Sequence, residues 1–220
     1  MVDEAQASAD FSCHPSIGCW SLPMKPDSTT IDIYNSKAEE YTQLSKDVDQ
    51  DIRLENFANT LPAKARVLDY GCGPGTSAAY FAGRGMVTHA FDASQEMVKL
   101  ASRHPKVTVW QAGFHEFNKI DSYDGVWASF SLLHAPRSDM NKLLLAIHKS
   151  LKTGGKFCLS VKLGKGEARD TLGRLYTYYE QNELETLLSA ANFTWENHFN
   201  GSGKGLDGST SRWISVFAHA

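Results

Sequence analysis

Short runs of β-branched and aromatic residues alternate with helical periodicity along most of the chain, and these runs predict strands. Seven strands are predicted, at Arg66–Tyr70, Met86–Phe91, Val107–Trp110, Tyr123–Ser129, Lys156–Leu163, Thr194–Phe199 and Arg212–His219. Helices are predicted at Thr76–Arg84, from Ser94 to about Arg103, at Arg137–Leu151 and at Asn182–Ala191, the last with Asn182 and Glu185 as its capping box. Repeated strand–helix units require a parallel sheet with right-handed crossovers. We therefore predict an α/β fold with a single doubly wound, mostly parallel seven-stranded sheet, helices on both faces and an antiparallel last strand.

The chain before the first predicted strand divides into two parts. Residues 1–30 hold prolines among small and polar residues and predict an irregular N-terminal arm. The pattern does not decide whether these residues cover the active site, lie on the surface or mediate a contact with a partner. The single folded domain is predicted over residues 31–220, with helical periodicity from Ile31 to Leu61 and Pro62 closing that region. The loop Asn200–Ser211, between the last two strands, is rich in glycine and serine.

The segment from Val67 to Gly75, which reads VLDYGCGPG, predicts a buried strand that turns sharply into a helix. Its glycines allow a positive φ and a close approach of a ligand, and the N-terminus of the helix from Thr76 attracts an anionic group. Asp69 would repel a pyrophosphate but would complement the ammonium of an amino-acid moiety. The spacing G-x-G-x-G also departs from the dinucleotide pattern G-x-G-x-x-G, so both features argue against NAD.

A second landmark is Asp92, at the end of the next predicted strand. It follows Gly73 by 19 residues, close to the ~20 expected for an acid that binds a ribose diol. A nucleoside joined to an amino acid is S-adenosylmethionine. With these two features the chain, from about Ile31 to its C-terminus, resembles the class I (Rossmann-like) S-adenosylmethionine-dependent methyltransferases of the small-molecule type.

The resemblance implies S-adenosylmethionine as the cofactor, S-adenosylhomocysteine as the product, and a set of cofactor contacts. These are Tyr34, Tyr41, Asp69, Gly71, Cys72, Gly73, Asp92, Ala93, Met97, Gly113, Phe114, Ser129 and Phe130. The two tyrosines correspond to a helix that folds over the cofactor in the family, although tyrosines on an apolar face also serve as core. Where the family usually carries a polar residue near the adenine, this chain has Ala112-Gly113-Phe114, so backbone groups and the packing of Phe114 or Met97 are expected there.

Three residues are candidates for catalysis: His134, Arg174 and Tyr178. His134 follows the fourth strand and is a candidate general base or substrate contact, or a histidine that only bonds within its turn. Arg174 and Tyr178 belong to the segment from Lys162 to Tyr179, whose basic and aromatic residues predict a lid over an anionic or aromatic acceptor. Packing against the sheet is the alternative role for this segment.

Composition, charge and missing motifs exclude further classes of function. A length of 220 residues fits one domain, and 22 basic against 25 acidic residues give a net charge of −3, which favours no nucleic-acid partner. The segment after strand four lacks the Asn/Asp-Pro-Pro-aromatic signature of the amino-methyltransferases of DNA bases. The N-terminus predicts neither a signal peptide nor a membrane span. The four cysteines predict a reducing, cytoplasmic location, with Cys13 and Cys19 as loop thiols and no metal site.

The sequence therefore predicts a transferase that moves a methyl group from S-adenosylmethionine to an oxygen, nitrogen or sulfur atom of a small molecule. The alternatives are a catalytically silent S-adenosylmethionine-binding partner and a methyltransferase of RNA or protein. A monomer or a homodimer is expected. The identity of the acceptor, the accepting atom and the use of a general base do not follow from the sequence.

Overall fold

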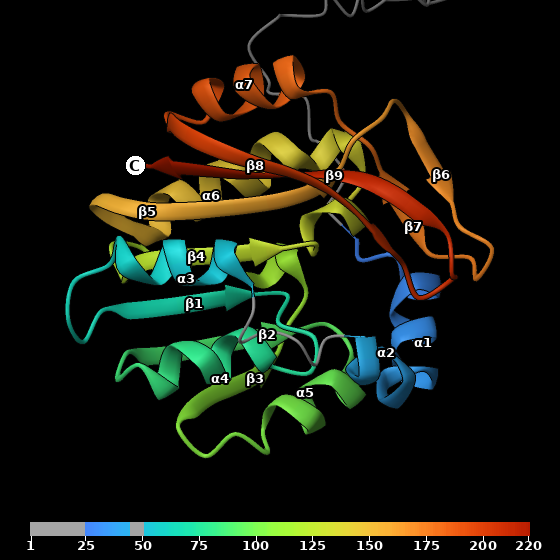
Figure 1. Ribbon diagram of the computed structural model, residues 1–220, viewed down its shortest axis with the longest axis horizontal. Helices are drawn as coiled ribbons and strands as arrows, with labels where there is room; N and C mark the ends of the chain where they lie inside the picture. Colours follow the sequence, from blue (N-terminus) through green and yellow to red (C-terminus); the bar gives the residue numbers. More distant parts are fainter. Residues whose placement is uncertain (1–24, 45–50) are drawn as a thin grey trace, which may run out of the picture.

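The computed structural model, which describes residues 25–44 and 51–220, is built on a seven-stranded sheet (Figure 1). Its strand order is β3-β2-β1-β4-β5-β9-β8. The strands are β1 (Arg66–Tyr70), β2 (Val87–Asp92), β3 (Val107–Gln111), β4 (Tyr123–Ser129), β5 (Leu151–Lys162), β8 (Thr194–Lys204) and β9 (Thr210–His219). Neighbouring strands from β3 to β5 are parallel, and β9 is antiparallel where it enters between β5 and β8. The predicted fold class is confirmed.

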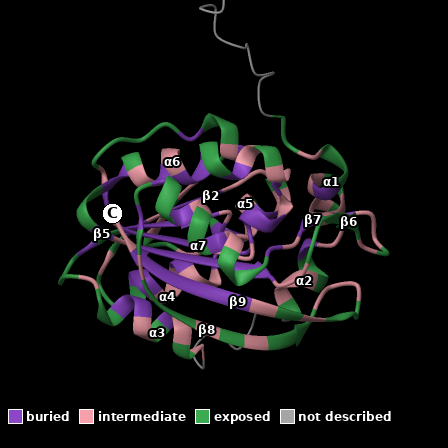
Figure 2. Ribbon diagram, turned by 90° about the horizontal axis from the view of Figure 1, so that it is seen from above, coloured by how far each residue is buried: buried purple, intermediate pink, exposed green. Residues whose placement is uncertain are grey.

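Helices cover both faces of the sheet, and the two larger apolar clusters of the described residues lie one on each face. The helices are α1 (Ser28–Ser36), α2 (Ala38–Leu44), α3 (Ile52–Asn59), α4 (Thr76–Gly83), α5 (Gln95–Ala101), α6 (Met140–Ser150) and α7 (Gln181–Ala190), with 3-10 turns at Phe114–Glu116, Leu132–His134 and Arg137–Asp139. Buried side chains of α3 and α4 pack with Val67 and Trp127, whereas those of α6 and α7 pack with Leu68 and Val126. In Figure 2, α6 and α3 accordingly lie on opposite sides of the buried strands.

Strand alternation positions the functional end of β1. Successive side chains of a strand point to opposite faces, so Val67 and Asp69 share the face that α3 and α4 cover, and Leu68 and Tyr70 share the other. Val67 is fully covered by that apolar cluster. Asp69, two residues closer to the carboxyl end, therefore reaches the edge of the sheet where parallel α/β proteins bind their ligands.

Several predicted boundaries are wrong. Helix α1 begins at Ser28, inside the predicted arm. Strand β5 begins at Leu151, directly after α6 ends at Ser150 and before the paired glycines Gly154 and Gly155 that were expected to precede it. The capping box of α7 is formed by Glu180 and Glu183, not by Asn182 and Glu185. The Ser94 cap of α5 is confirmed, since the Ser94 hydroxyl accepts a hydrogen bond from the Met97 N–H. Residues 1–24 of the predicted arm, with Cys13 and Cys19, lie outside the described residues.

Two predicted loops are partly strand. Residues 162–179 contain a separate hairpin of β6 (Glu167–Arg169) and β7 (Leu175–Thr177), which stands beside α1 (Figure 1). The β8–β9 ladder continues to the pair Lys204 and Thr210. Glycine permits this extension, because a Cβ at Gly201 would lie 2.2 Å from the ring of Trp213. Among the described residues, no helix combines the length and apolar character needed to cross a membrane.

Phe57 is expected to be a main contributor to stability. It is fully buried, and its ring lies 5.3 Å from that of Trp127 and 5.8 Å from that of Phe81. Removing a buried phenylalanine ring costs about 3–5 kcal/mol, so Phe57→Ala should lower the free energy of unfolding by that amount in urea denaturation. Ile52→Ala, on the same helix at a position 54% exposed, is the control and should change it by about 0.5 kcal/mol or less. Equal losses in the two variants would contradict this assignment of the core.

Candidate functional site

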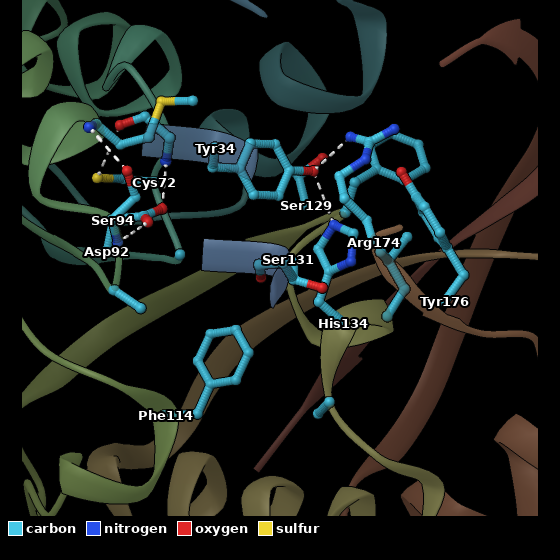
Figure 3. Close-up of a pocket in the computed structure, with 18 of the residues that line it drawn as sticks. Tyr34, Cys72, Asp92, Ser94, Phe114, Ser129, Ser131, His134, Arg174 and Tyr176 are labelled. Atoms are coloured by element: carbon cyan, nitrogen blue, oxygen red, sulfur yellow. Dashed lines mark hydrogen bonds between the residues drawn. The ribbon is translucent and has the colours of Figure 1, made fainter. Parts of the chain in front are cut away.

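A cavity of about 450 Å³ lies at the carboxyl ends of the parallel strands. It is lined by the loops that follow β1, β2 and β4, by the end of β5, by α1 and by the β8–β9 hairpin (Figure 3). Helix α1 and the hairpin come from opposite ends of the described chain, so the cavity exists only after the sheet has assembled. Its place is the usual ligand position of an open α/β sheet.

The glycine loop forms the part of the cavity after β1. Gly71, Gly73 and Gly75 have φ angles of 74°, 53° and 82°, a region that other residues adopt at a cost. Space is limited as well, because a Cβ at Gly71 would lie 2.4 Å from the Cβ of Ser131, and one at Gly75 would lie 2.8 Å from the Cβ of Ala101. The glycines therefore allow the chain to turn from β1 into α4 while it packs against neighbouring elements.

Asp69 brings an incompletely satisfied carboxylate to this cavity. The residue is 3% exposed, and its Oδ2 atom is buried without a hydrogen-bond partner. Burial raises the pKa of Asp69 to about 8; the backbone hydrogen bond from Ala78 works against this shift, and the charge of Asp92 adds to it. A cation in the cavity would supply the missing partner and would favour the ionised carboxylate.

Asp92, at the end of β2, is held by two backbone groups. The N–H of Gly73 donates to its Oδ2 and the N–H of Ser94 donates to its Oδ1, each at 2.9 Å. Burial raises the pKa of Asp92 despite these hydrogen bonds. Because each carboxylate oxygen can accept more than one hydrogen bond, both retain capacity toward the cavity that Asp92 lines. The arrangement suits two adjacent hydroxyl donors.

All of the residues predicted to contact the cofactor line this cavity. They are Tyr34, Tyr41, Asp69, Gly71, Cys72, Gly73, Asp92, Ala93, Met97, Gly113, Phe114, Ser129 and Phe130. Phe114 is oriented by stacking on Tyr70, with ring centroids 5.2 Å apart. The N–H of Gly113 donates to Glu116 Oε2 at 2.6 Å, so this backbone donor is already engaged.

His134 lies away from Asp92 and the glycine loop, in a hydrogen-bond network with Tyr34 and Arg174 (Figure 3). Its Nδ1 is 2.6 Å from the carbonyl oxygen of Leu175, which can only accept, so Nδ1 carries the proton. Nε2 then accepts from the Tyr34 hydroxyl at 2.8 Å, and Arg174 donates to that hydroxyl at 2.9 Å. Burial lowers the pKa of His134 to about 4. His134 is therefore neutral near pH 7, and both of its ring nitrogens are engaged.

Arg174 is 1% exposed and is held by Asp170, to whose Oδ2 its Nε and Nη2 donate at 2.9 and 2.7 Å. Its guanidinium also lies over the rings of Tyr34 and Tyr176, 5.2 Å from each centroid. Further contacts join the same hairpin to α1, since Thr30 Oγ1 accepts from the N–H of Leu175 at 2.9 Å. The β6–β7 hairpin thus holds α1 beside the cavity.

The structure does not bring Tyr178 to the cavity. Tyr176 and Arg174 line it, whereas Tyr178 packs over Gly164, where an added Cβ would lie 3.2 Å from the Cβ of Tyr178. Tyr176 and Tyr178 are two positions apart and their ring centroids lie 6.3 Å from each other, so residue spacing alone cannot show which of the two tyrosines lines the cavity. Within the predicted lid segment, Tyr176 takes the position that the sequence assigned to Tyr178.

Sequence reasoning missed the contribution of Arg53. This residue of α3 lines the cavity and lies over the rings of Phe130 and Trp213, 5.2 and 4.8 Å from their centroids. Its Nη1 donates to the hydroxyl of Ser215 at 2.9 Å. A signal was present, because Ser160 and Ser215 interrupt the apolar stretches 157–161 and 213–218; their hydroxyls meet at 2.7 Å.

Comparisons with known proteins agree with this geometry. A family model described as a methyltransferase domain matches residues 67–155, which include the glycine loop and Asp92. A ubiquinone biosynthesis O-methyltransferase of Xanthomonas axonopodis pv. citri is 35% identical over 117 residues, which are 50% of this chain and 48% of that protein. An S-adenosyl-L-methionine-dependent Diels-Alderase of Talaromyces variabilis is 34% identical over 109 residues, 45% of this chain and 37% of that protein. The chain thus spans about half the length, or less, of these curated relatives.

Solved structures share the fold over most of the chain. A 1,6-didemethyltoxoflavin-N1-methyltransferase of Burkholderia thailandensis, crystallised with 1,6-didemethyltoxoflavin and S-adenosylhomocysteine, has a TM-score of 0.71 at 22% identity and 93% coverage of both chains. The cyclase SpnF has a TM-score of 0.70 at 18% identity, over 90% of this chain and 97% of its own. At these identities the likeness concerns the fold. The methyltransferase-domain model matches the very loop and acid that line the cavity, so residues 67–155 are similar to a methyltransferase domain, on a sheet that shares the fold of these solved structures.

Proposed function

We propose that the protein binds S-adenosylmethionine in this cavity and transfers its methyl group to an oxygen, nitrogen or sulfur atom of a small molecule. The observation that carries the proposal is the pair of buried carboxylates: Asp69 lacks a partner for one oxygen, and Asp92 retains acceptor capacity on both. They flank one glycine loop and line one cavity. A ligand with an ammonium group at one end and a ribose diol nearby would satisfy both.

The residues fit this cofactor group by group. Asp69 would pair with the ammonium, and the glycine loop at the start of α4 would receive the carboxylate. Asp92 would accept hydrogen bonds from the ribose hydroxyls, with Phe114 and Met97 available to pack on the adenine. S-adenosylmethionine supplies a methyl group on a sulfonium, which an acceptor lone pair takes as the bonding electrons return to sulfur. The main task of the protein is to hold donor and acceptor in line.

For His134 and Arg174 we propose a positioning role. Since Tyr34 occupies His134 Nε2 and the carbonyl of Leu175 occupies Nδ1, this histidine is poorly suited to accept a proton from an acceptor. Together the two residues fix the Tyr34 hydroxyl and thereby hold α1 beside the cavity. Tyr178 has no proposed catalytic role, because it lies away from the lining.

Cofactor binding without methyl transfer is the alternative that the relatives named for cyclisation support. A methyltransferase of RNA is disfavoured by the net charge of −3. The cytoplasmic location and the monomeric or dimeric state remain predictions.

Calorimetric titration tests the cofactor assignment. The protein should bind S-adenosylmethionine and S-adenosylhomocysteine, and should bind NAD far more weakly, because NAD carries no ammonium group to pair with the unpartnered oxygen of Asp69. Incubation of a metabolite extract with the protein and isotope-labelled methyl donor should yield a labelled product by mass spectrometry. Tighter binding of NAD than of either adenosyl ligand would refute the assignment, and binding without any labelled product would favour the alternative.

Asp69 predicts a proton linkage. With its pKa raised to about 8, the carboxyl group is mostly protonated at pH 7 in the free protein, whereas the ammonium of the ligand requires the ionised form. Binding of S-adenosylhomocysteine at pH 7 should therefore release close to one proton from this site. Affinity should rise with pH up to about pH 8, by at most about tenfold per unit, and stop rising as the ligand amine deprotonates.

Calorimetry of this binding in buffers of different ionisation enthalpy measures the proton release. Asp69→Asn cannot ionise, so it should bind more weakly and release no proton from this site. The same release from the Asn variant would show that another group is responsible.

Asp92→Ala should weaken S-adenosylhomocysteine binding by about 1.5–3 kcal/mol, or one to two decades in the dissociation constant, because charge-assisted hydrogen bonds are lost. Asp92→Asn keeps one acceptor oxygen and should lose less. Glu96→Ala, on the adjacent helix and outside the cavity lining, is the control. Unchanged affinity in a folded Asp92→Ala protein would remove Asp92 from the site.

A further inference from the structure

Lys162 is a buried cation at the carboxyl end of β5 that the mechanism above does not use. It is 9% exposed and lines the cavity. Every second pair of β5 and β9 residues, namely Cys158 with Phe217, Ser160 with Ser215 and Lys162 with Trp213, lies on the same face of the sheet. Toward the cavity, the β5 side chains on this face are first the apolar Cys158, then the hydroxyl of Ser160, and last the ammonium of Lys162.

The charges around Lys162 differ from those around Arg53 and Arg174, two other cations of the lining. Arg53 donates to Asp51 and Arg174 donates to Asp170, so each guanidinium has a carboxylate partner. Within residues 25–44 and 51–220, Lys162 Nζ has no carboxylate within 4 Å and forms no hydrogen bond; its contact is the ring of Tyr176, 3.7 Å from Nζ to the centroid. The three N–H donors of this ammonium therefore remain available to a partner in the cavity.

The charged neighbours of Lys162 do not provide that partner. Burial lowers the pKa of Lys162, Arg174 lowers it further, and Asp207 and Asp170 act in the opposite direction from beyond ion-pair distance. The Asp207 carboxylate accepts from the backbone and hydroxyl groups of Ser209, and Asp170 is bound to Arg174. Both carboxylates are therefore already engaged elsewhere.

The walls on this side of the cavity are aromatic. Tyr176 lies under the ammonium, and Trp213 is paired with Lys162 across the strands. Phe130 meets Trp213 edge to face, with centroids 6.0 Å apart. Gly203 and Gly205 of the facing hairpin add no side chains. Flat faces next to an ammonium suit a planar ligand that carries a negative charge.

Resting on the proposed methyl transfer, we propose that Lys162 recognises the acceptor, and that the acceptor is an aromatic or conjugated acid whose anionic oxygen pairs with the Lys162 ammonium. The anion is either a carboxylate or an ionised hydroxyl. An ionised hydroxyl that is itself methylated needs no base, because its lone pair forms the O–C bond after the proton has already left. This agrees with the engagement of both ring nitrogens of His134.

The test uses the full chain saturated with S-adenosylhomocysteine and matched pairs of planar probes. Carboxylate probes are 4-hydroxybenzoate against 4-hydroxybenzamide and indole-3-acetate against indole-3-acetamide; the ionised-hydroxyl probe is 4-nitrophenolate against 4-nitroanisole. Dissociation constants are measured by calorimetry or ligand-observed NMR. The wild-type protein should bind the anion of at least one pair about tenfold or more tightly than its neutral partner, and the preferred pair identifies the type of anion.

Lys162→Met keeps the length of the side chain and removes the charge. It should abolish the preference for the anion, change the affinity of the neutral probe less than about twofold, and leave the affinity for S-adenosylhomocysteine unaltered. Lys162→Arg should retain the preference. Lys165→Met, three residues further along and outside the lining, is the matched control and should behave as wild type; melting temperatures check that each variant is folded.

Two results would overturn the proposal: a wild-type protein that prefers none of the anions, or a Lys162→Met protein that keeps the preference. If Lys162→Met does not fold, Lys162→Gln replaces it in the same titrations. Failure of the wild-type protein to bind S-adenosylhomocysteine would instead refute the proposed function. The titrations repeated on cofactor-free protein would still decide whether Lys162 selects anions.

Discussion

The close approach of Gly71 to Ser131 is the constraint on which the site depends. These two residues follow β1 and β4, adjacent parallel strands, and a Cβ at Gly71 would lie 2.4 Å from the Cβ of Ser131. Because no side chain intervenes, the turn after β1 packs directly on the segment that leads to His134. The carboxylates of Asp69 and Asp92 and the network around His134 consequently line a single cavity.

Helix α1 closes this arrangement through polar contacts instead of apolar packing. The Tyr34 hydroxyl accepts from Arg174 and donates to His134, while Thr30 receives a backbone N–H of β7. A buried polar network of this kind is stable only when its members are satisfied, and removal of one leaves the others unpaired. The same contacts leave both ring nitrogens of His134 engaged, which is the basis for the positioning role proposed above.

The cavity combines charges of opposite sign. Asp69 and Asp92 line it beside the glycine loop, and burial raises the pKa of both. Lys162 lines it at the end of β5, where burial lowers its pKa. Each group is thus held in an environment that favours its neutral form, and a ligand of opposite charge would restore the ionised form. Such a cavity is suited to a cationic donor and an anionic acceptor.

Local features of the chain could be derived from residue spacing. The strand and helix alternation, the glycine loop, the Ser94 cap and the distance from Gly73 to Asp92 all depend on backbone geometry and on neighbours within one βα unit. For this reason the fold class was predicted correctly, and the residues expected around the loop line one cavity at the end of the sheet. The wrong boundaries, such as the cap of α7, lie where alternative polar residues compete within a few positions.

Contacts between distant segments could not be derived in this way. That Tyr176 and not Tyr178 lines the cavity, that Arg53 lies over the rings of Phe130 and Trp213, and that Lys162 lacks a carboxylate partner among the described residues all depend on how remote elements meet. These outcomes are set by the register of β9 against β5 and by the docking of α1 on β7. Spacing along the chain carries no information about the register between strands some 50 residues apart. That register is decided by the packing of whole layers of side chains when the sheet forms.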